Sequence, residues 1–464
     1  MNRYLPSRRE FIKTTGRVAA ATALAGMSVP RVYAAGSDTL QLALIGCGGR
    51  GTGAVVDAMS VKSGGVKLVA MADVFAARLE QSHGALSDGH GDKMDVPPDR
   101  RLIGFDGYQR AMDCLKPGDI AILATPLAFR PVHFSYAIQK CLHLFMEKPL
   151  SADGPSSRRM LQLAQDASVK NLKVAVGLMS RHNRAIQELG QRLQDGAIGD
   201  IIFMRGYRMS GPGGSCFSEK WPGGAPSELL WQIARFHSFI WASGGLYNDF
   251  YIHLIDNLCM MKNAWPVKAQ ALGGRHYRKS PEGNLYVDQN FDSYSVEYTF
   301  ADGAKMLLDG RCVAGCNEIY SSYAHGSKGM AVVSAHGDCG MPSSIHSAQN
   351  PQPSNAIWIS NVKPDETNPY LNEWNDLVDA IRRDHPYNEA TRGVQASVVS
   401  SMGRMAAHTG QEVTYDQMLN HADAYAPDAD KFTMDSAPPL RSAPDGSYPI
   451  PMPGIITQHE YAMT

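Results

Sequence analysis

The sequence predicts an α/β fold in which a doubly wound parallel sheet is followed by a second, α+β domain. Short apolar runs suited to buried strands occur through the first part of the chain, at 40–45, 66–72, 120–124, 142–146 and 174–178. Farther on, residues 292–300 alternate apolar and polar side chains, and a turn at 301–303 leads into a further strand from Lys305. A chain of 464 residues, 44% of them hydrophobic, can form two domains with separate cores.

The first predicted strand runs directly into a glycine-rich turn, Gly46-Cys47-Gly48-Gly49-Arg50-Gly51. The first glycine of its G-x-G-x-x-G pattern permits a tight turn, the second lets the backbone approach a pyrophosphate, and the third lets the next helix pack on the strand. The helix expected from Thr52 would direct its N-terminus at the phosphates. We therefore predict a Rossmann dinucleotide site formed by Gly46, Gly48, Gly49, Arg50 and Gly51.

An acidic residue ends the second predicted strand. Asp73 lies 22 positions after Gly51, where a carboxylate can accept hydrogen bonds from the adenosine ribose and would repel a 2′-phosphate. NAD is therefore favoured over NADP, although Arg50 is near enough in sequence to offset that repulsion. The alternative is that Asp73 only caps a helix beginning near Val74.

Two later strands end in residues that should line the ligand crevice, since ligands bind at the carboxyl ends of parallel strands. One strand ends in Thr125-Pro126 and the next in Glu147-Lys148-Pro149, and we expect all of these except Pro149 to contact the cofactor. The Rossmann domain should span residues 36–180, with residues 181–464 forming the substrate and oligomerisation domain.

The segment Asp249-x3-His253-x2-Asp256 carries candidate catalytic groups. Residues four apart share one face of a helix, so Asp249 can orient His253 or bind a neighbouring hydroxyl. His253 could act as a base while Lys148 stabilises the developing alkoxide. The alternatives are a buried histidine in a helix core and a metal site. No third ligand stands at a suitable spacing, so no metal is expected here.

These motifs together resemble those of one family. The ordered set comprises the glycine loop, Asp73, Ala124-Thr125-Pro126, Glu147-Lys148-Pro149 and Gly244-Gly245-x3-Asp249-x3-His253-x2-Asp256. It is similar to the Gfo/Idh/MocA oxidoreductases, the family of glucose–fructose oxidoreductase and inositol dehydrogenase, from about Leu40 to Leu419. The resemblance implies a sugar or polyol substrate, catalytic roles for Lys148, Asp249 and His253, and an open, mainly antiparallel second sheet that forms homodimer or homotetramer contacts.

The sequence departs from that family in two places. Arg130 stands where many members carry a histidine, and neither Arg130 nor His133 is given a family role. The segment 212–239 is unusual and rich in aromatic residues, and we expect it near the substrate entrance. Arg235 and His237 within it, together with Arg181 and Asp256, are candidate substrate contacts. A packed aromatic cluster is an equally good interpretation of the segment.

Residues 1–35 have the layout of a signal peptide. Ser7-Arg8-Arg9-Glu10-Phe11-Ile12-Lys13 precedes an apolar segment and a small-x-small cleavage site near Ala34, a pattern typical of the twin-arginine pathway. The alternatives are an uncleaved N-terminal anchor and a basic helix that resembles a signal by chance. We expect a periplasmic or secreted protein, without membrane attachment after cleavage. Because that pathway exports folded proteins, a tightly bound NAD regenerated in place is expected.

Regeneration in place is compatible with two reaction classes. In one, a second sugar or keto substrate reoxidises the cofactor. In the other, an NAD-dependent glycoside hydrolase oxidises, eliminates, hydrates and reduces its substrate. The oxidoreductase is preferred, because the Asp249–His253 arrangement resembles the dehydrogenase branch. A non-catalytic sugar-binding protein would not need Lys148, Asp249 and His253 together.

Composition narrows the choice of partners. The net charge is −1 and no basic stripe occurs, so nucleic acid is not an expected partner. The part after the leader has no apolar run long enough to span a membrane. The eight cysteines are scattered and predict no disulfide framework. We expect a loop at 336–354, and a Pro-, Asp- and Ser-rich tail after Ala424 that runs along the surface or a partner subunit.

Overall fold

The computed structural model describes residues 39–462, so the predicted leader at residues 1–35 lies outside the described residues. A six-stranded parallel sheet has the order β3-β2-β1-β4-β5-β6. Its strands are β1 (Leu40–Ile45), β2 (Val66–Asp73), β3 (Arg101–Ile103), β4 (Ile120–Leu123), β5 (His143–Met146) and β6 (Val174–Val176). The order reverses between β1 and β4, which places a ligand crevice outside the carboxyl ends of these two strands. The predicted Rossmann fold is confirmed.

Helices cover both faces of this sheet. The helices along the sequence are α2 (Gly49–Met59), α3 (Ala76–His90), α4 (Gly107–Met112), α5 (Arg130–Gln139) and α6 (Gly154–Val169). Helices α2 and α3 share one apolar core with the strands, whereas α4, α5 and α6 share the other. Strand residues are buried on both faces, which explains the continuous apolar runs in the sequence.

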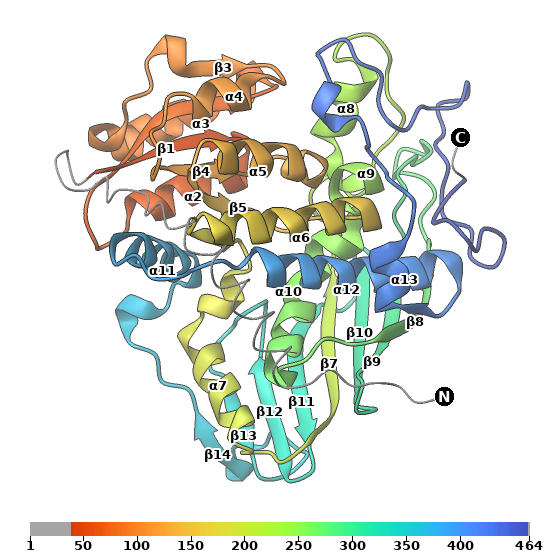
Figure 1. The fold of residues 1–464 in the computed structure, drawn as a ribbon. Helices are drawn as coiled ribbons and strands as arrows, with labels where there is room; N and C mark the ends of the chain where they lie inside the picture. Colours follow the sequence, from red (N-terminus) through yellow and green to blue (C-terminus); the bar gives the residue numbers. More distant parts are fainter. Residues whose placement is uncertain (1–38, 463–464) are drawn as a thin grey trace, which may run out of the picture. The chain divides into compact units, whose positions relative to one another are not determined.

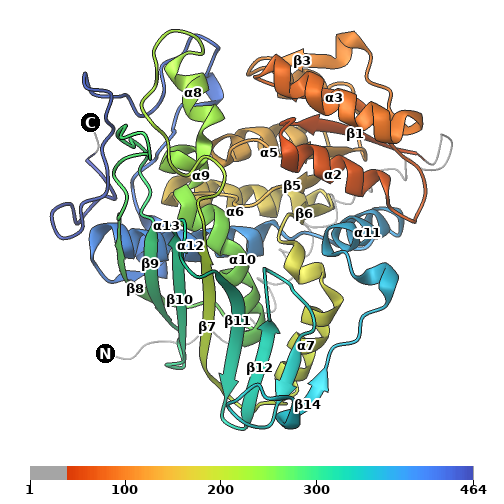
Figure 2. The ribbon, with the colours of Figure 1, turned by 180° about the vertical axis from the view of Figure 1, so that it is seen from behind.

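A helix from the C-terminal half completes the Rossmann core. Helix α11 (Pro369–Arg382) lies beside α2 and packs against the sheet (Figures 1 and 2). The indole of Trp374 stacks on Phe145 of β5, with ring centroids 4.8 Å apart. Side chains from beyond residue 180 therefore form part of the core of the Rossmann domain. Residues Leu40–Thr464 form one compact unit.

The second sheet has nine strands in the order β14-β13-β12-β11-β7-β10-β9-β8-β15. They are β7 (Ile201–Ser210), β8 (Lys268–Gly274), β9 (Ser293–Thr299), β10 (Lys305–Cys312), β11 (Ile319–Gly326), β12 (Gly329–Ser334), β13 (Ser344–His346), β14 (Ala356–Ile359) and β15 (Val413–Thr414). Only β7 and β10 pair in parallel, which confirms the mainly antiparallel sheet. Strand β13 lies in the segment expected to be only a loop, because three residues are too few for a clear alternation.

Two long helices cover one face of the second sheet, α10 (Gly245–Lys262) and α12 (Ala390–Thr409) (Figure 2). Shorter helices complete the chain: α7 (Arg184–Gln194), α8 (Glu228–Ala234), α9 (Ile240–Ser243) and α13 (Tyr415–Asn420). No helix between residues 39 and 462 is both long enough and apolar enough to cross a membrane.

The tail after Ala424 runs mostly along the surface of its own chain, as its composition predicts, and a few of its residues are buried. Glu460 is fully buried and forms two hydrogen bonds with Arg404 of α12, at 2.8 and 2.7 Å. Tyr425 donates a hydrogen bond to the same carboxylate at 2.5 Å. A few buried tyrosines and one ion pair thus attach a largely exposed tail to the core.

Candidate active site

The glycine loop has the geometry of a phosphate cradle. Gly46 has a φ of +98°, and a Cβ there would lie 2.7 Å from the carbonyl carbon of Ala124. A Cβ on Gly51 would lie 2.0 Å from the carbonyl oxygen of Gly46. Gly48 and Gly49, by contrast, face open space at the start of α2. The loop thus packs tightly on β4 while leaving backbone N–H groups at a helix N-terminus accessible to an anion.

Asp73 stands at the end of β2 and lines the same cavity. Its Oδ2 accepts a hydrogen bond from the Cys47 N–H at 2.7 Å, and its Oδ1 accepts one from the Phe75 N–H at 2.9 Å. The pKa of Asp73 is raised overall, because the effect of burial exceeds the opposing effects of these hydrogen bonds and of the charge of Arg78. Each carboxylate oxygen keeps a further lone pair with which it can accept a ribose hydroxyl.

Arg50 lines the same cavity as Asp73 but pairs with a different carboxylate. Its guanidinium pairs with Glu147 at 2.8 Å and stacks on Tyr370, 4.7 Å from the ring centroid. The arginine beside Asp73 is Arg78, which lines the cavity and was not singled out from the sequence. Arg78 is therefore the side chain available to a 2′-phosphate.

Thr125 and Pro126 line the cavity beyond β4, and buried Arg130 holds this strand end in place. Its guanidinium donates hydrogen bonds to the carbonyl oxygens of Leu123, at 2.6 Å, and Thr125, at 2.9 Å. Burial lowers the pKa of Arg130 to about 10. The position at which many relatives carry histidine is thus filled here by a structural cation.

Lys148 and Asp249 meet at the far end of the cavity. The Lys148 ammonium donates a hydrogen bond to the backbone oxygen of Asp249 at 2.6 Å and lies 3.4 Å from Oδ1 of its carboxylate. Oδ2 of the same carboxylate lies 3.3 Å from Nε2 of His237. Burial alone would raise the pKa of Asp249, but Lys148 and His237 outweigh burial and lower it. Asp249 is therefore ionised and lies between Lys148 and His237.

His253 lies one helical turn after Asp249 on α10. Its Nδ1 is buried and has no hydrogen-bond partner among residues 39–462. Burial, followed by the positive charges of Lys148 and Arg208, lowers the pKa of His253 well below the usual value. The imidazole is consequently neutral near pH 7. His253 does not itself line the cavity, in contrast to Lys148, Asp249 and His237.

The cavity measures about 360 Å³, within the range of small-molecule sites. All ten predicted cofactor residues line it: Gly46, Gly48, Gly49, Arg50, Gly51, Asp73, Thr125, Pro126, Glu147 and Lys148. The sequence analysis missed an aromatic wall formed by Phe75, Phe105, Tyr108 and Phe129. These four residues stand in separate loops and short helices, so no periodic pattern in the sequence could have shown this wall.

Three of the four substrate candidates lie away from the cavity lining. Arg181 and Asp256 form a bidentate ion pair with each other, at 2.7 Å. Arg235 donates a hydrogen bond to the Ser218 hydroxyl at 3.0 Å. Only His237 reaches the cavity, because the 3₁₀ helix Phe236–Ser238 turns it toward Asp249. Trp231 of the same unusual segment instead stacks on Tyr448 in a packed aromatic cluster.

In sequence, the chain is similar to known sugar and inositol dehydrogenases. The chain is 27% identical over 208 residues to a levoglucosan dehydrogenase of Pseudarthrobacter phenanthrenivorans, covering 41% of this chain and 48% of the relative. It is 23% identical over 185 residues to an inositol 2-dehydrogenase of Corynebacterium glutamicum, covering 39% and 49%. The alignments thus span about half the length of these relatives. No family model matches the chain.

Solved structures share the fold over most of the described chain. A levoglucosan dehydrogenase in complex with NADH and levoglucosan superimposes with a TM-score of 0.60 at 18% identity, covering 82% of this chain and 100% of the other. An aldose-aldose oxidoreductase from Caulobacter crescentus gives 0.59 at 17% identity, covering 81% and 99%. The chain therefore shares the fold of these solved dehydrogenase and oxidoreductase structures.

Proposed function

We propose that this chain is an NAD-dependent oxidoreductase acting on a CH–OH carbon of a sugar, glycoside or polyol. One observation carries the proposal: a single cavity leads from a glycine loop built for a pyrophosphate to a lysine–aspartate pair built for an alcohol. The relatives named for levoglucosan and inositol oxidation support the same chemistry.

The residues present fit a nicotinamide dinucleotide. Gly48 and Gly49 leave space for phosphates at the start of α2, and Asp73 can accept hydrogen bonds from a ribose. Glu147 and Lys148 line the cavity beyond β5, where the nicotinamide end would be held. The bound cofactor supplies the hydride acceptor. Asp73 favours NAD, while Arg78 keeps NADP a weaker alternative.

In alcohol oxidation the protein must remove the hydroxyl proton and stabilise the alkoxide that develops. We assign the second task to Lys148, whose ammonium is a compact charge held by Asp249. We assign the first to His253, because its imidazole is neutral and lies on α10 one turn after Asp249, which lines the cavity. Both ring nitrogens of His237 already lie near other groups, Nε2 beside Asp249 and Nδ1 3.0 Å from the Ser215 hydroxyl.

The decisive experiment is absorbance at 340 nm on protein purified without added cofactor. Sugars, polyols and glycosides are offered one at a time. A lasting rise, stoichiometric with protein, would establish alcohol oxidation by bound NAD. Release of an aglycone from a glycoside without a lasting rise would instead establish the redox-neutral hydrolase. No absorbance change and no product, even with NAD and NADP supplied, would refute the proposal.

We also propose export through the twin-arginine pathway, on the basis of Arg8 and Arg9 ahead of an apolar segment. Replacing both arginines with lysine should retain the protein in the cytoplasm, which cell fractionation would detect. Accumulation of the variant in the periplasm at the wild-type level would contradict this route.

A homodimer or homotetramer through the second sheet is a further part of the proposal. Residues on β9 and β10 alternate between buried and half-buried, so one face lies under α10 and α12 while the other is partly exposed. Sedimentation of the purified protein tests this assembly. A monomer at micromolar concentration would contradict it.

A further inference from the structure

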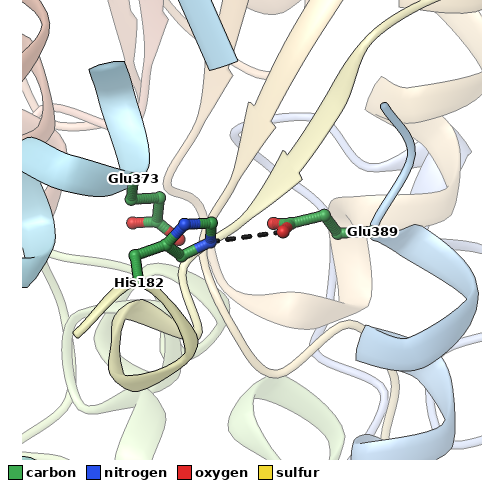
Figure 3. A group of neighbouring side chains, drawn as sticks. All are labelled: His182, Glu373 and Glu389. Carbon is green, nitrogen blue, oxygen red and sulfur yellow. Dashed lines mark ion pairs between the residues drawn. The ribbon is translucent and has the colours of Figure 1, made fainter. Parts of the chain in front are cut away.

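A buried cluster of ionisable side chains lies outside the catalytic cavity, where β6 leads into α7. His182 ends the 3₁₀ helix Met179–His182, Glu373 lies in α11, and Glu389 directly precedes α12. Figure 3 shows the imidazole between the two carboxylates. One ligand atom from each of the three lies within 4.8 Å of those of the others. Residues nearly 200 positions apart in the sequence are thus brought together.

The cluster contains polar atoms without partners. The side chain of Glu373 comes from a residue that is 1% exposed, and neither of its oxygens has a hydrogen-bond partner within residues 39–462. Nε2 of His182 lies 3.2 Å from Oε1 of Glu389 without hydrogen-bond geometry. Buried polar atoms are almost always paired, so these three atoms indicate a ligand.

The other nitrogen of His182 is already held as it is in many metal sites. Nδ1 lies 2.7 Å from Oδ2 of Asp376, which also pairs with Arg184 at 2.8 Å. A carboxylate that accepts the Nδ1 proton fixes the tautomer and leaves the Nε2 lone pair free to coordinate. Nε2 itself points toward the carboxylate of Glu389 (Figure 3).

Glu389 is anchored in place. Its Oε2 accepts a hydrogen bond from the Val176 N–H of β6 at 3.0 Å, and its Oε1 pairs with Arg392. Asp376 pairs with Arg184 and Glu389 pairs with Arg392, whereas neither oxygen of Glu373 has a hydrogen-bond partner in the described residues. A buried carboxylate without such a partner is strongly destabilising, so a cation or a proton must accompany it.

Protonation of Glu373 alone would not give its buried oxygens a hydrogen-bond partner. Protonated Glu373 would gain an O–H donor, yet no acceptor in the described structure contacts either of its oxygens. The set of one imidazole nitrogen and two carboxylates matches ions that accept both donor types. We propose that His182, Glu373 and Glu389 bind a divalent transition-metal cation, with Zn²⁺ as the ion to test first.

The position suggests a structural task for the ion. It would join the end of the Rossmann sheet to α11 and α12, the two C-terminal helices that pack nearest to it. Bonds of about 2.0–2.2 Å would draw the three side chains closer together than they are now. The metal proposal is independent of the proposed enzymatic activity.

The test uses untagged full-length protein purified without chelator. Its metal content is measured by plasma mass spectrometry, and chelator-treated protein is then titrated with Zn²⁺ by calorimetry and in thermal unfolding. We expect one ion per chain and a Tm that rises with Zn²⁺ concentration, because binding to the folded state alone stabilises it.

Glu373→Gln keeps the side-chain shape and removes the charge, and it should weaken Zn²⁺ binding by tenfold or more. Asp379→Asn on the same helix, which breaks only an exposed pair with Arg383, should bind as the wild type does. Unchanged Zn²⁺ affinity in Glu373→Gln would overturn the proposal. So would wild-type protein that takes up no stoichiometric metal, which would assign the space to water. This wild-type result decides the matter even if the variant does not fold.

Discussion

The ammonium of Lys148 lies 3.4 Å from the carboxylate of Asp249, although 101 residues separate them in the sequence. Lys148 follows β5 of the parallel sheet and Asp249 lies in the helix that covers the second sheet. The pair therefore marks the place where the two halves of the chain meet over the cavity.

Lys148→Met should reduce turnover by about two to three orders of magnitude, because the developing alkoxide loses its cationic partner. Cofactor affinity should change little, since the glycine loop and Asp73 remain. Turnover is measured with the substrate found in the absorbance screen, and cofactor affinity by fluorescence titration. Lys140→Met, at a partly exposed lysine paired with Asp113, is the matched control and should behave as wild type.

His253→Ala should reduce turnover by about 10²–10⁴-fold, the usual contribution of a general base, and added imidazole should restore part of the loss. His237→Ala should have a smaller effect on kcat and a larger one on KM, because His237 positions Asp249 at the cavity wall. A greater kcat loss in His237→Ala than in His253→Ala would move the base assignment to His237.

Asp73→Ser should shift cofactor preference toward NADP by about tenfold or more, because a 2′-phosphate would no longer face a carboxylate. Arg78 remains beside it as a partner for the phosphate. Binding of NAD and NADP to the variant and to Asp73→Ser/Arg78→Ala separates the two contributions. Equal NADP affinity in both variants would exclude a role for Arg78.

Gly51→Ala should destabilise the protein and abolish cofactor binding, because the new Cβ would lie 2.0 Å from the Gly46 carbonyl oxygen. Gly49→Ala meets no atom within 4 Å and should unfold at about the wild-type temperature. Thermal unfolding followed by circular dichroism provides the comparison. Similar Tm losses in both variants would contradict the tight packing of α2 on the glycine turn.

His133→Phe should flatten the acid side of the stability profile. Burial, helped by the charge of Arg130, lowers the pKa of His133 to about 3, below its unfolded value of about 6.5. The unfolded chain therefore binds an extra proton between these values, and stability is lost as pH falls through this window. The contribution is about 1.4 kcal/mol per pH unit. Urea unfolding of both proteins at pH 7.5 and pH 5 measures how much stability each one loses on acidification. The variant should lose less than the wild type, and above pH 7 His133 should add no pH dependence to the stability of either protein.

The Rossmann half was predictable because its signals are local. Buried strands appear as apolar runs, and the glycine turn reports its own backbone requirements. Strand β3 was missed because Arg101-Leu102-Ile103 forms no apolar run. The docking of Trp374 on Phe145 could not be predicted, because it depends on packing between segments more than 200 residues apart.

The residues of the candidate site also differ in whether a local sequence signal predicts them. The cofactor residues follow strands and turns that the sequence shows, and the cavity contains all of them. The roles of Lys148 and Asp249 came from family resemblance, and their proximity required the fold. His237 was one candidate among four, and no spacing in the sequence could distinguish it from Arg235, Arg181 or Asp256.

The buried pair of Arg404 and Glu460 has a consequence for synthesis of the protein. Both side chains are fully inaccessible, and Glu460 supplies the counterion of a guanidinium in the longest helix of the second domain. A chain that ends before residue 460 contains that guanidinium without its counterion. Tyr425 also lacks the carboxylate to which its hydroxyl donates a hydrogen bond. A product shortened before Glu460 would therefore lose about 3–5 kcal/mol of stability and would be cleaved by proteases more readily than the full chain.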